Sequence, residues 1–277
     1  METTTFHWSE KDGIKIFAKD WKPATDPRAV ICLVHGMGEH CSRYDHMAKF
    51  YSEHGIAMVG YDRRGHGNSE GKRGHTTTFE AFLNEIDHLL DAAKERYPGK
   101  PIILYGHSMG GNLVLNYFLR RNPDIALLVT TGAWIRLAFE PPKFLIWLAR
   151  ISNKIAPGFT QGNNLKTEHI STDPVEVKKY ENDPLVHDRI TSATAVNMFD
   201  ACDWLLAQKT ELSVPALIMH GSSDQIIAAS GSQDFAANNS GDITTKLWEG
   251  MYHEVHNEKD KQAVFNYTLE WVNSKLA

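Results

Sequence analysis

Cysteine is scarce in this chain, which has three in 277 residues and no C-x-x-C pair. Cys32, Cys41 and Cys202 lie far apart, so the sequence argues against a disulfide framework and indicates a reducing compartment. Basic charge is not in excess either, because 29 Lys and Arg stand against 34 Asp and Glu, for a net charge of −5. No basic cluster is present, and we therefore expect no nucleic-acid partner.

Long hydrophobic runs are also missing. The first residues, Met1–Trp21, are polar and charged and contain no apolar signal-peptide core. The densest apolar run, Phe144–Ile151, is interrupted by Arg150, whereas a membrane-spanning helix needs about 20 apolar residues. We therefore expect a cytoplasmic protein that associates with membranes at most peripherally.

Short, almost continuous apolar runs recur along the chain instead. They are typical of strands buried on both faces of a parallel sheet, and they cover residues 29–34, 56–61, 101–105, 125–129 and 214–219. Residues 244–248 are the expected last strand. A half-polar run predicts an edge strand over 14–21. Apolar residues at three-and-four spacing predict helices between the strands, over 79–97 (capped by Thr77 and Glu80), 113–121 and 261–276. This alternation predicts an α/β fold in which a mostly parallel sheet is flanked by helices.

The regular alternation fails between residues 134 and 194. There, several prolines and a polar, glycine-containing stretch replace the strand pattern. We interpret residues 134–194 as a cap, or lid, inserted over the sheet. The predicted core then consists of a first part, residues 1–133, and a second part, residues 195–277.

A G-x-S-x-G motif is the clearest functional signal. It spans Gly106 to Gly110, follows an apolar strand and opens an apolar helix, which is the context of a nucleophile elbow. Ser108 would sit on a strained turn in which larger residues at Gly106 and Gly110 would clash. A plain turn is the alternative, but the context favours an α/β-hydrolase fold with Ser108 as nucleophile.

An oxyanion hole requires backbone N–H donors near this serine. This fold takes one donor from the residue after the nucleophile, which is Met109, and one from the loop after an early strand. The glycine-rich turn after the strand at 29–34 places Met37 in that position. We therefore expect the backbone N–H groups of Met37 and Met109 to bind the oxyanion.

The other two members of a catalytic triad should follow the serine in the order acid, then histidine. Asp224 ends a late strand and is the expected acid, with Asp200 and Asp203 as rivals in a helical pattern. His253 follows the last strand and is the expected general base, with His256 as its competitor. The spacing of these histidines does not match the zinc motif H-E-x-x-H, so we expect no metal site.

Six motifs, in order along nearly the whole chain, resemble those of the monoacylglycerol lipase family. They are His35–His40, Tyr61–Gly71, Gly106–Gly111, Asn182–Leu185, His220–Asp224 and Tyr252–Glu254. The resemblance implies hydrolysis of a monoacylglycerol to glycerol and a fatty acid, through an acyl-enzyme and without a cofactor. It also implies that Glu39, Arg43 and His107 help to hold the glycerol head group.

An apolar stretch in the expected cap fits a lipid ester substrate. From Phe144 onward, nearly every position around the predicted helix is apolar. We expect Phe144, Leu145, Trp147 and Leu148 to line an acyl channel, and the cap to contact a membrane surface transiently. Packing of this helix against the sheet is the alternative.

Other functions stay open on the sequence alone. They are a lysophospholipase, a broad-specificity carboxylesterase, an acyltransferase, and a non-catalytic lipid-binding scaffold. The sequence predicts no particular oligomeric state.

Overall fold

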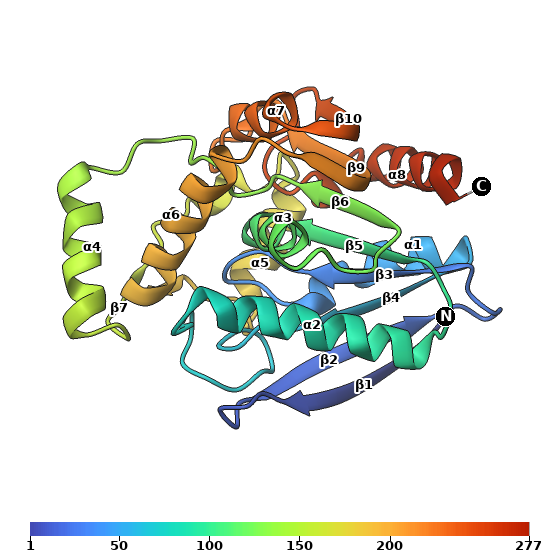
Figure 1. The fold of residues 1–277 in the computed structure, drawn as a ribbon, viewed down its shortest axis with the longest axis horizontal. Helices are drawn as coiled ribbons and strands as arrows, with labels where there is room; N and C mark the ends of the chain where they lie inside the picture. Colours follow the sequence, from blue (N-terminus) through green and yellow to red (C-terminus); the bar gives the residue numbers. More distant parts are fainter. Residues whose placement is uncertain (277) are drawn as a thin grey trace.

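The computed structural model describes residues 1–276, and an eight-stranded sheet forms its centre (Figure 1). In spatial order the strands are β1 (Glu2–Ser9), β2 (Lys15–Lys22), β4 (Ile56–Tyr61), β3 (Ala29–Val34), β5 (Ile102–His107), β6 (Leu127–Thr131), β9 (Glu211–Gly221) and β10 (Ser240–Trp248). All pairs from β4 to β10 are parallel. The β1–β2 and β2–β4 pairs are antiparallel.

Helices cover both faces of this sheet. One face packs against α2 (Phe79–Arg96), α3 (Met109–Arg121), α6 (Ser192–Leu206) and α7 (Ala229–Asn238). The other face packs against α1 (Asp45–Glu53) and α8 (Lys261–Leu276). The five predicted apolar runs and the expected strand at 244–248 all overlap strands of the sheet. The predicted α/β-hydrolase fold, a mostly parallel sheet flanked by helices, is therefore confirmed.

Some local predictions are wrong. The pattern does not predict β1, because its residues are mostly polar and exposed and pair only with β2 at the edge of the sheet. The N-cap of α2 is Thr78 rather than Thr77, since the Thr78 side chain accepts a hydrogen bond from the backbone N–H of Ala81. Helix α3 begins at Met109 rather than Leu113, because its first turn continues directly from the serine turn.

Between β6 and α6 the chain leaves the sheet. It forms α4 (Lys143–Ile155), a two-stranded sheet of β7 (Thr160–Gly162) and β8 (Arg189–Thr191), the short 3₁₀ helix η2 (Thr167–His169) and α5 (Pro174–Asn182). Figure 1 shows α4 beside α6, at the far left and away from the sheet. The excursion begins after the expected boundary, because Trp134 and Ile135 are still buried in the core. No helix within residues 1–276 is long and apolar enough to span a membrane.

Candidate active site

Ser108 occupies a strained turn between β5 and α3. Its backbone has φ 54° and ψ −118°, a conformation that residues other than glycine rarely adopt. A Cβ on Gly110 would lie 2.0 Å from the carbonyl oxygen of Val34, and a Cβ on Gly106 would lie 2.4 Å from the carbonyl oxygen of Gly110. Both glycines are therefore required for the helix to start this close to the sheet, as the motif predicts.

The loops after β5, β9 and β10 bring three predicted residues together. The Oγ atom of Ser108 lies 2.8 Å from Nε2 of His253, and Nδ1 of His253 lies 2.7 Å from Oδ2 of Asp224. All three side chains are almost fully buried. They form one hydrogen-bonded chain at the carboxyl ends of the strands, where open α/β sheets bind their ligands. The rivals for the acid lie elsewhere, since Asp200 forms a surface ion pair with Arg150 on α4.

Asp224 is held by more groups than the sequence indicates. Its Oδ1 atom accepts hydrogen bonds from the backbone N–H groups of Ile226 and Ile227, at 2.8 and 2.9 Å. Its Oδ2 atom also lies 3.1 Å from Nε2 of His220, whose Nδ1 contacts the hydroxyl of Ser232. His220 was part of a recognised motif but had no predicted role, because only the fold brings its ring to the carboxylate.

The pair of Asp224 and His253 shifts the pKa of each group in favour of its charged form. Burial alone would raise the pKa of Asp224 and lower that of His253, because both charged forms lose hydration. The attraction and hydrogen bond between them outweigh burial, so the pKa of Asp224 is lowered and that of His253 is raised. The pair therefore favours the imidazolium form of His253, as a catalytic triad requires of its acid and base.

The predicted oxyanion loop lies directly against the nucleophile. A Cβ on Gly36 would lie 3.3 Å from Cβ of Ser108 and 2.7 Å from a carboxylate oxygen of Glu39. The backbone N–H groups of Met37 and Met109 donate to no other residue within 1–276. Two backbone donors left free next to this loop and the serine turn match the requirement of an oxyanion hole.

Glu39 and Arg43 belong to a buried ionic network. Arg43 forms a bidentate pair with Glu254 at 2.7 Å and also contacts Glu39 at 2.7 Å, and these three side chains are 2–8% exposed. Glu39 accepts in addition from the Gly36 N–H and the Tyr44 hydroxyl. Burial raises the pKa of Glu39. Burial would also raise the pKa of Glu254, but the charge of Arg43 and its hydrogen bonds have the larger effect and lower it to about 2. The network therefore ties the oxyanion loop to the residue that follows His253.

This network changes the expected head-group set. Glu39 and His107 line the active-site cavity, as does Glu254, which the sequence did not single out. Arg43 lies behind the carboxylates that it binds and is not part of the cavity wall within the described chain. Its expected contact with a head group is therefore replaced by a contact with two carboxylates.

Two further histidines, His107 and His256, lie close to His253. The ring of His107 lies 4.8 Å from that of His253 and 4.6 Å from that of His256. Burial, together with His253, lowers the pKa of His107 to about 3, so this ring is neutral at physiological pH. His256 stacks on Tyr44, whereas the ring that lies within hydrogen-bond distance of Ser108 Oγ is that of His253.

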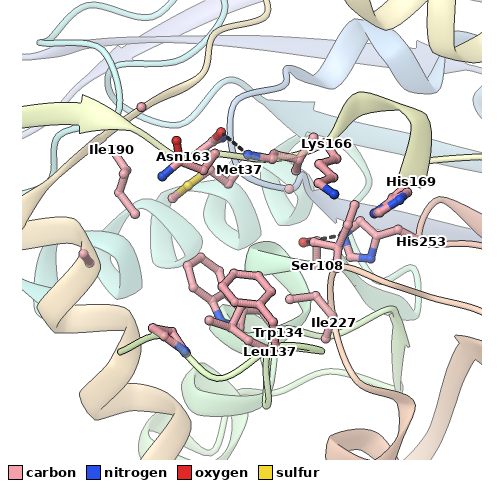
Figure 2. Close-up of a pocket in the computed structure, with 18 of the residues that line it drawn as sticks. Met37, Ser108, Trp134, Leu137, Asn163, Lys166, His169, Ile190, Ile227 and His253 are labelled. Atoms are coloured by element: carbon pink, nitrogen blue, oxygen red, sulfur yellow. Dashed lines mark hydrogen bonds between the residues drawn. The ribbon is translucent and has the colours of Figure 1, made fainter. Parts of the chain in front are cut away.

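A cavity of about 580 Å³ opens above Ser108 and His253. One of its walls is apolar and another is polar. Apolar side chains from the cap, α6 and the loop before α7 form one wall, including Leu137, Leu145, Ile146, Ala149, Phe199, Ile226 and Ile227. Polar side chains from the segment before and within η2 form another, including Gln161, Asn163, Asn164, Lys166 and His169. Figure 2 shows Trp134, Leu137 and Ile227 on one side of the Ser108–His253 pair, with Lys166 and His169 on the other.

The expected acyl channel is only partly correct. Of the four residues proposed on α4, Leu145 lines the cavity, whereas Phe144, Trp147 and Leu148 do not. Phe144 and Trp147 are 62% and 60% exposed. The cavity face of α4 is formed by Leu145, Ile146 and Ala149, which follow helical spacing. An apolar pattern on all sides could not indicate which face would turn inward.

Comparison with known proteins agrees with this geometry. The family model that matches residues 25–260 is described as serine aminopeptidase, S33 (Hydrolase_4). A monoacylglycerol lipase of Mycolicibacterium smegmatis is 33% identical, over 95% of this chain and 95% of its own length. An abhydrolase domain-containing protein of Dictyostelium discoideum is also 33% identical, but this chain spans only 28% of its length.

Solved structures show the same relationship. The monoacylglycerol lipase of Paleococcus ferrophilus matches with a TM-score of 0.85 and 29% identity, over 99% of this chain and 100% of that one. The family model and the full-length relatives therefore confirm the resemblance that the motifs indicate. The chain belongs to the S33 family of serine hydrolases, together with the monoacylglycerol lipases.

Proposed function

We propose that this protein hydrolyses monoacylglycerols to glycerol and a free fatty acid, with Ser108, His253 and Asp224 as its catalytic residues. The observation that carries the proposal is the continuous hydrogen-bonded chain of these side chains beneath a cavity with one apolar and one polar wall. The relatives named as monoacylglycerol and monoglyceride lipases support the choice of substrate.

The first half of the reaction forms an acyl-enzyme. His253 accepts the proton of Ser108 as its Oγ attacks the ester carbonyl, and the amides of Met37 and Met109 stabilise the oxyanion. Asp224 stabilises the imidazolium, since the pKa shifts of this pair favour the ion pair. The protonated His253 then donates its proton to the departing glycerol oxygen, and the ester C–O bond breaks.

The second half releases the fatty acid. Water enters at the position that glycerol has left, and His253 removes a proton from it as it attacks the acyl-enzyme. The oxyanion forms again at the same amides, and Ser108 departs with the proton from His253. No cofactor takes part in either half of the reaction.

The two cavity walls orient the substrate. The acyl chain lies along Leu137, Leu145 and Ile146 because burial of its methylene groups is favourable there. The glycerol hydroxyl groups lie toward the polar wall and toward Glu39 and His107, which offer hydrogen-bonding groups. The segment that leaves the sheet after Ile135 and returns at α6 acts as the cap that covers this cavity.

The experiment that tests the function compares the purified protein with a Ser108→Ala variant on 1-oleoylglycerol. We expect the variant to lose roughly 10⁴-fold or more of the rate, as removal of a triad nucleophile does elsewhere. A Ser274→Ala variant on α8 serves as the control and should keep full activity. A fluorophosphonate probe should label the unmodified protein at Ser108 alone; an unlabelled serine would instead indicate a non-catalytic scaffold.

We also propose that the outer face of α4 contacts lipid surfaces. Phe144, Trp147 and Ile155 are 62%, 60% and 79% exposed, and Lys143 and Lys154 flank them at the two ends of the helix. Exposed aromatic residues bordered by lysines suit the interface between lipid head groups and acyl chains. Peripheral contact there would deliver the substrate next to the cavity.

The test of surface contact uses one substrate in a membrane and one in solution. A Trp147→Glu variant should cleave 1-oleoylglycerol in phospholipid vesicles several-fold more slowly, because the charge opposes insertion. The same variant should cleave soluble 4-nitrophenyl acetate at the normal rate. Leu247→Glu, on the edge strand β10, is the matched control and should change neither rate; equal losses on both substrates would contradict the proposal.

A further inference from the structure

Two basic side chains reach the active-site cavity from one short segment of the cap. Lys166 is the N-cap of η2 and His169 is its last residue, and both line the cavity that contains Ser108 and His253. Figure 2 shows both side chains projecting toward the Ser108–His253 pair. The two basic groups therefore face the same cavity.

Neither of these side chains is neutralised by the protein. Within residues 1–276, the Lys166 ammonium and the His169 ring form no hydrogen bond or ion pair with another residue. Some other cations of the cap are paired, such as Lys179 with Glu176 and Arg150 with Asp200. An exposed lysine is usually only a solvated surface charge, but this one belongs to the wall of a substrate cavity.

The carboxylates of the same cavity do not compensate these groups. Glu39 and Glu254 are both bound to Arg43, and Glu39 also accepts from the Gly36 N–H and the Tyr44 hydroxyl. The acid of the triad, Asp224, is occupied by two histidines and two backbone N–H groups. The charge left unpaired toward the substrate is therefore positive, and it lies on the polar wall.

We propose that Lys166 and His169 form a phosphate subsite, so that the active site also accepts monoacylglycerols whose glycerol carries a phosphate. This inference rests on the proposed function, because it assigns a second head group to the same ester-cleaving site. A lysine ammonium binds phosphate as a point charge, and an imidazole donates an N–H whatever its charge state. With the acyl chain on the apolar wall, the glycerol side of the ester faces these two residues.

The reaction is the same hydrolysis with a different leaving alcohol. Ser108 Oγ bonds to the acyl carbon as the ester C–O bond breaks, and the serine proton passes through His253 to the oxygen of glycerol phosphate. Water then releases the fatty acid. The phosphate ester itself is not cleaved, and no further reactant is needed.

The decisive experiment measures kcat and KM on two substrates, 1-oleoylglycerol and 1-oleoylglycerol 3-phosphate, each diluted to the same low mole fraction in neutral detergent micelles. We expect the unmodified protein to cleave both. The double variant Lys166→Met/His169→Gln should lose on the order of tenfold in kcat/KM on the phosphate substrate, mainly through a higher KM. Its kcat/KM on 1-oleoylglycerol should fall several times less than on the phosphate substrate, because a neutral hydroxyl group gains less from these two residues than a phosphate does.

The matched control is Lys178→Met, which removes an exposed lysine of α5 that does not line the cavity. It should change neither kinetic constant. A similar loss on both substrates in the double variant, or selective loss in the control, would overturn the subsite. Cleavage of 1-oleoylglycerol without cleavage of its phosphate would overturn the subsite and leave the proposed function intact, whereas cleavage of neither would overturn both.

A second measurement identifies the group that is bound. Glycerol 1-phosphate should inhibit hydrolysis of 4-nitrophenyl butyrate more strongly than glycerol does, and the double variant should lose this difference. Inorganic phosphate should inhibit only weakly, because it lacks the glycerol that fits beside the serine. Equally strong inhibition by inorganic phosphate would contradict the assignment to a lipid head group.

Discussion

Replacing Asp224 by asparagine tests how the base is held. The side chain keeps its shape, and the asparagine oxygen can still accept from the backbone N–H groups of Ile226 and Ile227. The other oxygen, which now accepts from His253 and His220, becomes an amide nitrogen that donates. His253 must then present Nδ1 as an acceptor, so its proton moves to Nε2, the atom that should take the proton of Ser108.

The loss should be large for two reasons. First, His253 adopts the tautomer that cannot accept the serine proton. Second, its imidazolium form loses the Asp224 carboxylate, whose attraction offsets the cost of burying that charge in the unmodified protein. In a serine protease the same change lowers kcat by about 10⁴-fold, which corresponds to about 5 kcal/mol of transition-state stabilisation. We expect a loss of this size in kcat on 1-oleoylglycerol, with KM nearly unchanged.

The pH profile supplies an independent measurement. In the unmodified protein kcat/KM should fall as pH drops through the pKa of His253, which lies above the ordinary histidine value of 6.5. In Asp224→Asn burial still lowers the pKa of His253, and its largest opposing contribution, the Asp224 carboxylate, is gone, although Glu254 and Glu39 still raise it. The acidic limb of the profile should therefore move to lower pH. Asp200→Asn and Asp203→Asn are the matched controls. A variant that keeps a tenth of the activity, or an acidic limb that does not move, would refute the role given to Asp224.

Three further variants test other parts of the structure. Gly110→Ala should unfold the protein or lower its melting temperature strongly, since its Cβ would lie 2.0 Å from the Val34 carbonyl oxygen; Gly158→Ala, with no heavy atom closer than 3.7 Å, should be neutral in the same thermal scan. Arg43→Met should lower the free energy of unfolding by about 3–5 kcal/mol in urea titration, because it leaves two buried carboxylates without their cation. Adding Glu254→Gln should recover part of this loss, and no recovery would show that charge burial is not its cause. Thr78→Ala should cost about 1 kcal/mol through the lost cap of α2, whereas Thr77→Ala should cost almost nothing; the reverse order would contradict the observed cap.

The parts of the fold that could be predicted are those that depend on local sequence patterns. A strand buried on both faces needs a continuous apolar run, so β3 and β4 match their predicted ranges residue for residue. The nucleophile could be predicted because a serine turn between a strand and a helix requires glycine on both sides. The order of acid and base along the chain then indicated Asp224 and His253.

The rest depends on contacts between distant segments. Arg43 and Glu254 lie 211 positions apart in the sequence. No local sequence pattern around either residue predicts that the two side chains will pair. The inward face of α4 is decided by its packing against α6, so its all-round apolar pattern left Phe144 and Trp147 wrongly assigned to the channel. Lys166 and His169 lie in a segment without periodicity, and only the folded cap shows that they reach the cavity.

The base comes from a residue 145 positions beyond the nucleophile, in the loop after the last strand at the edge of the sheet. During synthesis, Ser108 therefore leaves the ribosome long before His253 exists. Until β10 has paired with β9 and the histidine loop has docked, the serine is an ordinary alcohol that cannot attack an ester. The chain therefore cannot cleave esters until its last strand and the loop that follows it have folded.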